Sequence, residues 1–280
     1  MTQSGEIRIG VGGWTFEPWR GVFYPPELRQ KDELRYAAGK LTAIEINGTY
    51  YGLQKPESWR KWAAETPDDF VFTVKGSRFV TNRRVLAEAG EAVGRFMDQG
   101  LLELGDKLGP ILWQFANTKK FDEADFGAFL ALLPREIGGR RIRHCVEVRH
   151  DSFRTPAFAA LLRRFEIPVV FADHAVYPAF ADVIGEFVYA RLQTGSDEIE
   201  TAYAPADLDL WADRLKTWAA GGRPEGLDCA DPAHHAEARP REVFAFIIHE
   251  GKTRAPAGAM ALIERCNKLI NKPSGVVART

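Results

Sequence analysis

Eight short runs of apolar and β-branched residues recur along this chain, and stretches with helical periodicity follow most of them. This alternation is typical of a parallel sheet whose strands are wrapped by helices. The runs that we predict as strands cover residues 7–11, 43–47, 70–75, 110–115, 144–149, 168–173, 187–192 and 243–248. Eight such strands in 280 residues predict an α/β protein, a single (β/α)8 barrel of the TIM type over residues 1–280.

The stretches between the strands predict helices and two irregular segments. Helices are expected at residues 32–38, 56–65, 85–104, 123–132, 156–165, 205–219 and 258–270. Only a short helix, at about residues 176–183, fits between the sixth and seventh strands, so that βα unit is expected to be short or irregular. A segment rich in Gly, Pro, Ala and His at about residues 221–241 is expected to be a loop insertion.

A doubly wound open sheet is the main alternative to the barrel. In that fold, a G-x-G-x-x-G turn after the first strand opens a helix and binds a dinucleotide. Residues 10–19 read GVGGWTFEPW, which lacks this spacing. The sequence therefore favours the barrel and gives no support to a dinucleotide site.

Charge and cysteine content exclude several classes of protein. Thirty-seven Lys and Arg residues against 38 Asp and Glu give a net charge of −1, so no overall positive field attracts nucleic acid or an anionic membrane. The N-terminal residues have no signal-peptide pattern, and no apolar stretch reaches the roughly 18 residues that a membrane span needs. Three scattered cysteines fit a reducing compartment. We therefore expect a cytoplasmic protein without a membrane partner, in which any anion site is local.

Polar side chains stand near the C-terminal end of almost every predicted strand. Strands of a parallel barrel are buried on both faces and are normally apolar throughout, and the active sites of such barrels lie at this end. Buried acids and bases are costly unless they are paired or bind something polar, so we expect one functional pocket. Its candidate members are Glu45, Asn47, Lys75, Gln114, Glu147, Arg149, His150, Asp173, Arg191 and His249. For any single member, the alternative is an ion pair that only closes the barrel.

Several motifs resemble the YecE family. They are Gly13-Trp14, residues 19–25 (WRGVFYP), 44–51 (IEINGTYY), 112–115 (LWQF) and 146–153 (VEVRHDSF). The resemblance covers nearly the whole chain and implies a (β/α)8-type barrel, without implying a particular reaction. Two positions depart from the family pattern: many relatives have an Asn-Asn pair where residues 248–251 read IHEG, and a Trp where Phe153 stands.

Glu45 and Glu147 are the predicted acid/base pair, and Asp173 is a third catalytic candidate. Desolvation raises the pKa of a carboxyl in a dry pocket, and a cationic neighbour lowers it. The predicted cationic neighbours are Lys75, Arg149 and Arg191. Three cations in one pocket also predict a small anionic ligand, a phosphate or carboxylate, that an arginine clamps through two hydrogen bonds.

A divalent metal is an alternative use for the acidic strand ends. Glu45, Glu147, Asp173 and His249 are all residue types that bind such ions. The nearby cationic strand ends would repel a cation, and no H-x-x-H or H-E-x-x-H spacing is present. We therefore predict no metal and no cofactor.

Two function classes follow from these features. The first is an enzyme, a hydrolase, lyase or isomerase, that uses acid/base chemistry on an anionic and phosphorylated substrate, with Trp14, Asn47, Tyr50, His150 and His249 among its substrate contacts. The second is a protein that binds or processes nucleic acid through a basic cluster and an aromatic loop at the barrel mouth. The loop follows the first strand and contains Trp14, Phe16, Trp19, Phe23 and Tyr24. The basic cluster consists of Lys75, Arg78, Arg83 and Arg84.

Overall fold

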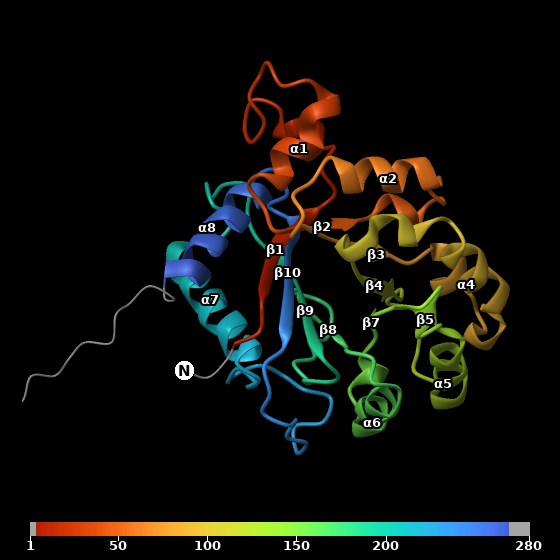
Figure 1. Cartoon of the computed structure of the whole chain (residues 1–280). Coiled ribbons are helices and arrows are strands. Elements are labelled where there is room, and N and C mark those ends of the chain that lie inside the picture. The colour runs from red at the N-terminus through yellow and green to blue at the C-terminus, as the bar shows by residue number, and fades with distance from the viewer. Residues whose placement is uncertain (1–3, 269–280) are drawn as a thin grey trace, which may run out of the picture.

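The computed structural model describes residues 4–268, apart from the side chains of His249 and Lys268. Eight parallel strands of this part of the chain form one sheet that curls into a nearly closed barrel (Figure 1). They are β1 (Ile7–Gly12), β2 (Ala43–Ile46), β3 (Val71–Lys75), β4 (Leu108–Gln114), β7 (His144–Glu147), β8 (Val170–Asp173), β9 (Phe187–Thr194) and β10 (Glu242–Glu250). Each predicted strand is present, and the barrel prediction is confirmed. A small separate hairpin consists of β5 (Glu136–Ile137) and β6 (Arg140–Arg141).

The barrel has a seam between β7 and β8. The sheet order is β7-β4-β3-β2-β1-β10-β9-β8, so chain neighbours pair all the way round and β1 pairs with β10. Within the described residues, one isolated parallel bridge between Val146 and Val169 joins the two end strands. The backbone N–H of Val146 donates to the carbonyl of Pro168 at 3.0 Å there. The barrel therefore closes through a single bridge rather than a full ladder.

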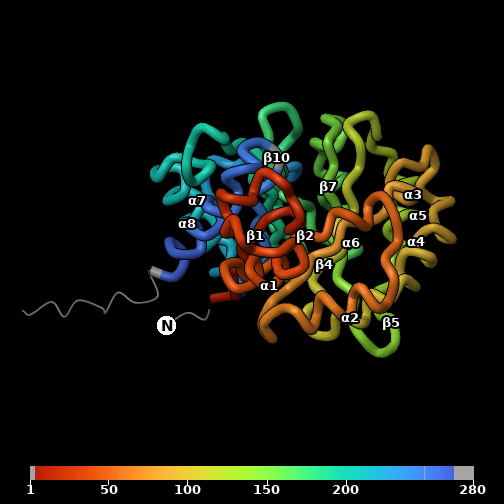
Figure 2. The backbone as a smooth tube through the Cα atoms, turned by 90° about the horizontal axis from the view of Figure 1, so that it is seen from above, coloured from red at the N-terminus to blue at the C-terminus, as the bar shows by residue number. Residues whose placement is uncertain are grey.

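Helices surround the strands on the outside (Figures 1 and 2). They are α1 (Glu33–Ala38), α2 (Pro56–Ala64), α3 (Arg78–Thr81), α4 (Gly90–Met97), α5 (Glu123–Leu132), α6 (Pro156–Phe165), α7 (Pro205–Ala219) and α8 (Ala255–Lys268). Proline occupies the first turn of α2, α6 and α7, where its missing N–H costs no helical hydrogen bond. The predicted end of the last helix at residue 270 lies outside the described residues.

The helix predicted over residues 85–104 is wrong as a continuous element. The chain forms a 3-10 turn at Leu86–Glu88, then α4, then a 3-10 segment at Leu101–Lys107. Gly100 ends the helical path with a φ of 98°, a left-handed conformation that favours glycine.

The short helix expected at about residues 176–183 is also absent, although the irregular βα unit is confirmed: residues 174–186 contain no helix. Backbone groups of the loop at residues 221–241 bind this connection instead. The Asp182 carboxylate accepts the N–H groups of Ala230 and Asp231 at 2.7 and 2.9 Å, and Ala181 donates to the carbonyl of Asp228 at 2.7 Å. The loop therefore satisfies the Asp182 carboxylate and the backbone N–H of Ala181.

Strand alternation divides the buried side chains into two sets. One set packs between the barrel and the helices, and the other fills the lower part of the barrel interior. The interior set is Ala43, Val71, Leu112, Cys145, Val170, Phe187, Tyr189, Phe244, Phe246 and Ile248. Because side chains two residues apart share a face, each strand continues this interior face toward its C-terminal end. On β2, β3, β4, β7 and β9 that continuation is polar: Glu45, Thr73, Lys75, Gln114, Glu147 and Arg191.

Candidate active site

A cavity of about 360 Å³ opens at the C-terminal ends of the strands. The polar side chains that line it are Asn47, Lys75, Gln114, Arg149, Arg191, Gln193 and Lys252. The first five are predicted site residues, and they come from five strands and the residues that follow them. The fold thus brings five of the candidates into one cavity.

Arg191 bridges the two buried carboxylates beneath this cavity. Its Nη2 and Nε lie 3.0 and 3.1 Å from the two oxygens of Glu45, and its Nη1 lies 2.5 Å from Oε2 of Glu147. Nη1 also donates to Oε1 of Gln114 at 3.0 Å. Both carboxylates are fully buried and Arg191 is 5% exposed. One guanidinium therefore joins side chains of β2, β4, β7 and β9.

Glu45 receives a further hydrogen bond from deeper in the barrel. The hydroxyl of Tyr189 donates to its Oε2 at 2.7 Å, and the hydroxyls of Tyr189 and Thr73 lie 2.9 Å apart. Burial and the charge of Glu45 raise the pKa of Tyr189. The phenol therefore keeps its proton and remains a donor to the carboxylate.

The electrostatics keep Glu147 ionised. Burial by itself raises the pKa of this carboxyl, but the positive charges of Arg191, Arg149 and Lys75 outweigh burial and lower the pKa to about 2. In return, Glu147 and Glu45 outweigh the burial of Arg191 and raise its pKa. At neutral pH Glu147 has no proton to donate, and its carboxylate acts as a fixed negative charge.

Lys75, unlike Glu147, has a pKa close to neutral pH. Burial, and then the charge of Arg191, lower the pKa of its amine to about 8, although Glu45 and Glu147 act in the other direction. Its Nζ lies 4.8 Å from the centroid of the Tyr50 ring. An amine with this pKa can gain or lose a proton near neutral pH, which is the requirement for a general acid or base.

Arg149 is held from two sides while its outer nitrogens face no described acceptor. Its Nε donates to Oε1 of Glu147 at 2.7 Å, and its guanidinium carbon lies 4.6 Å from the centroid of the Tyr177 ring. In the part of the chain that the structure describes, its Nη atoms make no hydrogen bond. The guanidinium plane is therefore fixed, with donors left for a ligand.

Of the seven polar side chains named above, Gln193 and Lys252 are absent from the predicted set. Gln193 lies two positions beyond Arg191 on β9, so alternation alone identifies its face; its buried Nε2 has no hydrogen-bond partner among residues 4–268. Lys252 follows β10, and its Nζ lies 4.1 Å from the centroid of the Phe16 ring. Burial lowers the pKa of Lys252. No sequence pattern distinguishes Lys252 from an ordinary surface lysine.

When the amines of Lys75 and Lys252 are protonated, the cavity carries an excess of positive charge. Its cations are Lys75, Arg149, Arg191 and Lys252, and its carboxylates are Glu45 and Glu147. Four positive and two negative charges leave two positive charges. An anion with two negative charges would balance this excess, and an anion with one would halve it.

The structure places Asp173 away from the cavity, which corrects its assignment to the pocket. On β8 its neighbour Ala172 pairs with Arg191 and faces the interior, while Asp173 pairs with Leu192 and faces outward. Its Oδ2 accepts from the hydroxyl of Thr194 at 2.5 Å. Burial raises the pKa of Asp173 against the effect of this hydrogen bond.

The remaining predicted substrate-binding residues either do not line this cavity or have a side chain that the structure does not describe. His150 caps a short 3-10 turn, since its Nδ1 accepts the N–H of Ser152 at 3.0 Å. Trp14 lines a second cavity of about 350 Å³, which shares Gly12, Asn47 and Lys252 with the first. Tyr50 lines a neighbouring groove. The side chain of His249 is not among those described.

Residues 4–268 contain neither a cluster of metal ligands nor a helix that could span a membrane. Among residues 4–268, no three His, Cys, Asp or Glu side chains come together in a way that could hold a metal ion. In that part of the chain, no helix combines the length and the apolar character needed to cross a membrane. The described cysteines Cys145, Cys229 and Cys266 are free.

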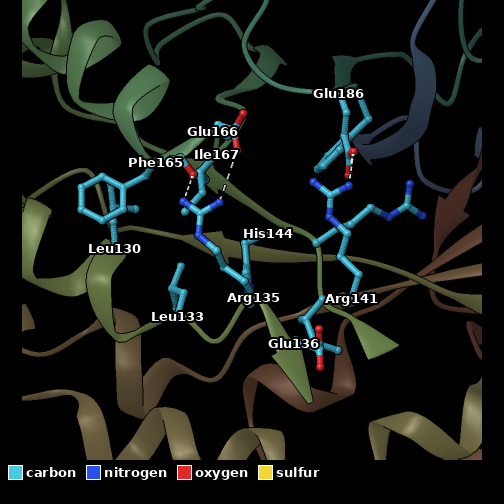
Figure 3. Close-up of a pocket in the computed structure, with 13 residues that line it drawn as sticks. Leu130, Leu133, Arg135, Glu136, Arg141, His144, Phe165, Glu166, Ile167 and Glu186 are labelled. Atoms are coloured by element: carbon cyan, nitrogen blue, oxygen red, sulfur yellow. Dashed lines mark hydrogen bonds and ion pairs between the residues drawn. The ribbon is translucent and has the colours of Figure 1, made fainter. Parts of the chain in front are cut away.

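A further pocket, of about 320 Å³, lies near the other end of β7 and β9 (Figure 3). Two ion pairs join side chains of this pocket: Arg135 contacts Glu166 at 3.4 Å and Arg141 contacts Glu186 at 2.7 Å. These pairs lie at least partly in solvent, where they contribute little. The arginines here are matched by carboxylates, in contrast to the cationic excess of the cavity at the barrel mouth.

The fold and the cavity define a TIM-type α/β barrel with a polar, cationic site at the C-terminal ends of its strands. Residues 8–277 match the family described as Protein of unknown function DUF72. The chain belongs to this family.

Individual relatives agree with this assignment and confirm the resemblance to YecE proteins. The UPF0759 protein YunF of Bacillus subtilis is 25% identical over 158 residues, 54% of this chain and 54% of YunF. The UPF0759 protein YecE of Escherichia coli K12 is 28% identical over 150 residues, 52% of this chain and 50% of YecE. The chain thus spans about half the length of the curated relatives it matches.

A solved structure has a similar fold. The crystal structure of a DUF72 family protein from Thermotoga maritima has a TM-score of 0.69 at 21% sequence identity. The match covers 95% of this chain and 100% of that one. At this identity the likeness concerns the fold alone.

Proposed function

We propose that this protein is an enzyme that performs acid/base chemistry on a small anionic, phosphorylated substrate bound in the cavity at the barrel mouth. Hydrolysis, elimination and isomerisation are the reaction types that such chemistry serves. The observation that carries the proposal is the convergence of Lys75, Arg149 and Arg191 on one cavity above two buried carboxylates.

Arg149 and Arg191 are the proposed anion clamp. Arg149 has free donors in a fixed plane, which suits the two-bond geometry of a phosphate or carboxylate. Asn47, Gln114 and Gln193 add amide groups at the same cavity wall. Amides of this kind donate N–H groups to phosphate oxygens and also recognise uncharged polar atoms of a substrate, such as hydroxyl or carbonyl groups.

Proton transfer is assigned to Lys75 rather than to Glu147. A carboxyl with a pKa of about 2 is a poor acid/base group at neutral pH, whereas an amine with a pKa of about 8 is well matched. In this proposal, Glu45 and Glu147 hold Arg191 and Arg149 in place and partly offset the positive charge around Lys75. Their role is positioning, and the chemistry uses no metal, because the neighbouring cations oppose a divalent ion.

We further propose that the protein works in the cytoplasm. The three described cysteines are unpaired, and two of them, Cys145 and Cys266, are buried. Unpaired thiols are typical of a reducing compartment.

Calorimetric titration with inorganic phosphate at pH 7 tests the anion site. We expect binding by the unaltered protein and a loss of affinity of at least about tenfold in Arg149→Gln, the size of one charged hydrogen-bonded contact. Arg141→Gln, at the opposite end of the barrel, is the matched control and should bind as the unaltered protein does. Equal phosphate affinity in Arg149→Gln and Arg141→Gln would show that Arg149 does not clamp the anion.

A screen of small phosphorylated compounds for turnover then tests the chemistry. Lys75→Arg keeps a positive charge but raises the pKa of that side chain far above neutral. We expect this variant to bind phosphate and to lose most turnover of any compound that the unaltered protein converts. Full turnover by Lys75→Arg would assign proton transfer to another group.

A further inference from the structure

A groove of about 880 Å³ runs beside the cavity on the C-terminal side of β3 and β4. Its charged side chains are Arg83, Arg84, Lys119, Lys120, Asp122 and Asp125. Four cations against two carboxylates give it two net positive charges. This local excess contrasts with the nearly neutral chain as a whole.

The two carboxylates of the groove are already used within the protein. Asp125 contacts Nζ of Lys119 at 2.9 Å, and Asp122 caps α5 by accepting the N–H of Asp125 at 2.9 Å. The exposed side chains of Arg84 and Lys120 make no ion pair with a residue in the described range. Their charges are therefore available to an anionic partner.

Exposed aromatic rings lie close to this groove. Tyr51 is 65% exposed and Phe79 is 62% exposed. The guanidinium carbon of Arg78 lies 5.7 Å from the Tyr51 centroid and 5.5 Å from the Phe79 centroid. Large aromatic side chains are costly to leave in water, and rings combined with arginine are the surface that stacks bases.

Tyr50 connects the groove to the cavity. It lines the groove, and its ring lies 5.1 Å from that of Tyr51, which lines the cavity. The Nζ of Lys75, another residue of the cavity, lies 4.8 Å from the centroid of the Tyr50 ring. A chain of adjacent side chains therefore leads from the basic groove to the proposed active site.

We infer that this groove binds a single strand of nucleic acid. Phosphates of the strand lie against Arg83, Arg84 and Lys120, and bases stack on Tyr51 and Phe79. An acidic peptide would match the charges but would leave the two rings unused, so the rings favour a nucleic acid. The inference goes beyond the proposed reaction, because the groove and the cavity are lined by different cations.

Fluorescence anisotropy with a labelled strand of about 12 nucleotides, within the range that such grooves cover, tests the inference with DNA and RNA separately. We expect binding at low salt, with an affinity at least about tenfold lower in the double variant Arg84→Glu/Lys120→Glu. The salt dependence should also weaken, by a slope of about 0.7 for each lost phosphate contact. Arg141→Glu, at the far end of the barrel, is the control for a simple change in charge.

A second variant tests the rings. Tyr51→Ser/Phe79→Ser changes two exposed side chains and no charge, and we expect it to weaken strand binding by about tenfold or more. Unaltered binding by this variant, together with equal displacement by polyglutamate, would replace the nucleic acid with an acidic protein partner. No strand binding at low salt, or an equal loss of strand affinity in Arg141→Glu, would overturn the inference. Titration of the cavity with inorganic phosphate is a separate test of the proposed reaction.

Discussion

Arg191 binds Glu45 through two nitrogens, with Nη2 3.0 Å from Oε1 and Nε 3.1 Å from Oε2. This two-bond pair joins β9 to β2 across the barrel interior, and both side chains are almost fully buried. Buried pairs of this kind are sensitive to loss of one partner, because the remaining charge stays out of water. The pair is therefore a structural requirement as well as a part of the proposed site.

Arg191→Met should strongly destabilise the fold. The variant leaves Glu45 and Glu147 without their shared cation, and we expect the free energy of unfolding at pH 7 to fall by about 3–5 kcal/mol. Urea denaturation measures this change. Arg141→Met removes a largely exposed pair with Glu186 and should cost less than about 1 kcal/mol; similar losses in both variants would contradict the special role of Arg191.

Protonation of Glu147 in acid should make the fold less stable. Its pKa falls from an ordinary 4.5 to about 2 in the folded protein, so its stabilising effect is present above pH 4.5 and is lost as the pH falls toward 2. The loss should reach about 3 kcal/mol. Chemical denaturation across this pH range measures it. Glu147→Gln removes this titration, so a pH dependence as steep as that of the unaltered protein would refute the assignment.

Lys75 should react as an unusually acidic amine. Because its pKa is about 8 in the folded protein, its rate of acetylation by acetic anhydride should rise with a midpoint near pH 8. The exposed Lys31 is the internal control for the amount of reagent. Peptide mass spectrometry measures both rates in one sample. Inorganic phosphate should slow the modification of Lys75 and leave that of Lys31 unchanged. A rate for Lys75 that shows no midpoint near pH 8 would exclude Lys75 as the proton-transfer group.

The Lys75 amine also has a consequence for stability in alkali. Its folded pKa is below its ordinary value of 10.5, so the folded protein loses this proton first as the pH rises. Stability from this group therefore increases between about pH 8 and pH 10.5. Comparison of chemical denaturation of the unaltered protein and Lys75→Met in this range isolates the effect. A Lys75→Met variant with the same slope would show that the amine is not desolvated.

Gln193→Met should separate ligand binding from stability. The buried Nε2 of Gln193 has no partner among the described residues, and an unsatisfied buried donor costs about 1–3 kcal/mol. The apolar side chain should therefore leave the free energy of unfolding unchanged or raise it, while phosphate affinity falls several-fold. Thermal denaturation and calorimetric titration measure the two effects. A large loss of stability would mean that Gln193 serves the fold rather than a ligand.

The sequence by itself determined the strands and the inward face of most of them. The period of two residues along a strand places Glu45 with Asn47, and Glu147 with Arg149, on one face. Polar residues at the ends of strands that are otherwise apolar identified the barrel mouth as the candidate site. These features are local, because alternation and apolar runs depend only on neighbouring positions in the chain.

The tertiary structure alone decided which residues meet and with what charge. Residues 168–173 are apolar on both faces up to Asp173, so only the register of β8 with β9 turns that carboxylate outward. Lys252 enters the cavity from a loop, where no periodicity fixes its position. The pKa directions of Glu147 and Lys75 depend on the balance between burial and nearby charges, above all that of Arg191, which lies far from both residues in the sequence. Electrostatic interactions depend on distance in space and on exposure to water, and neither is a property of the sequence order.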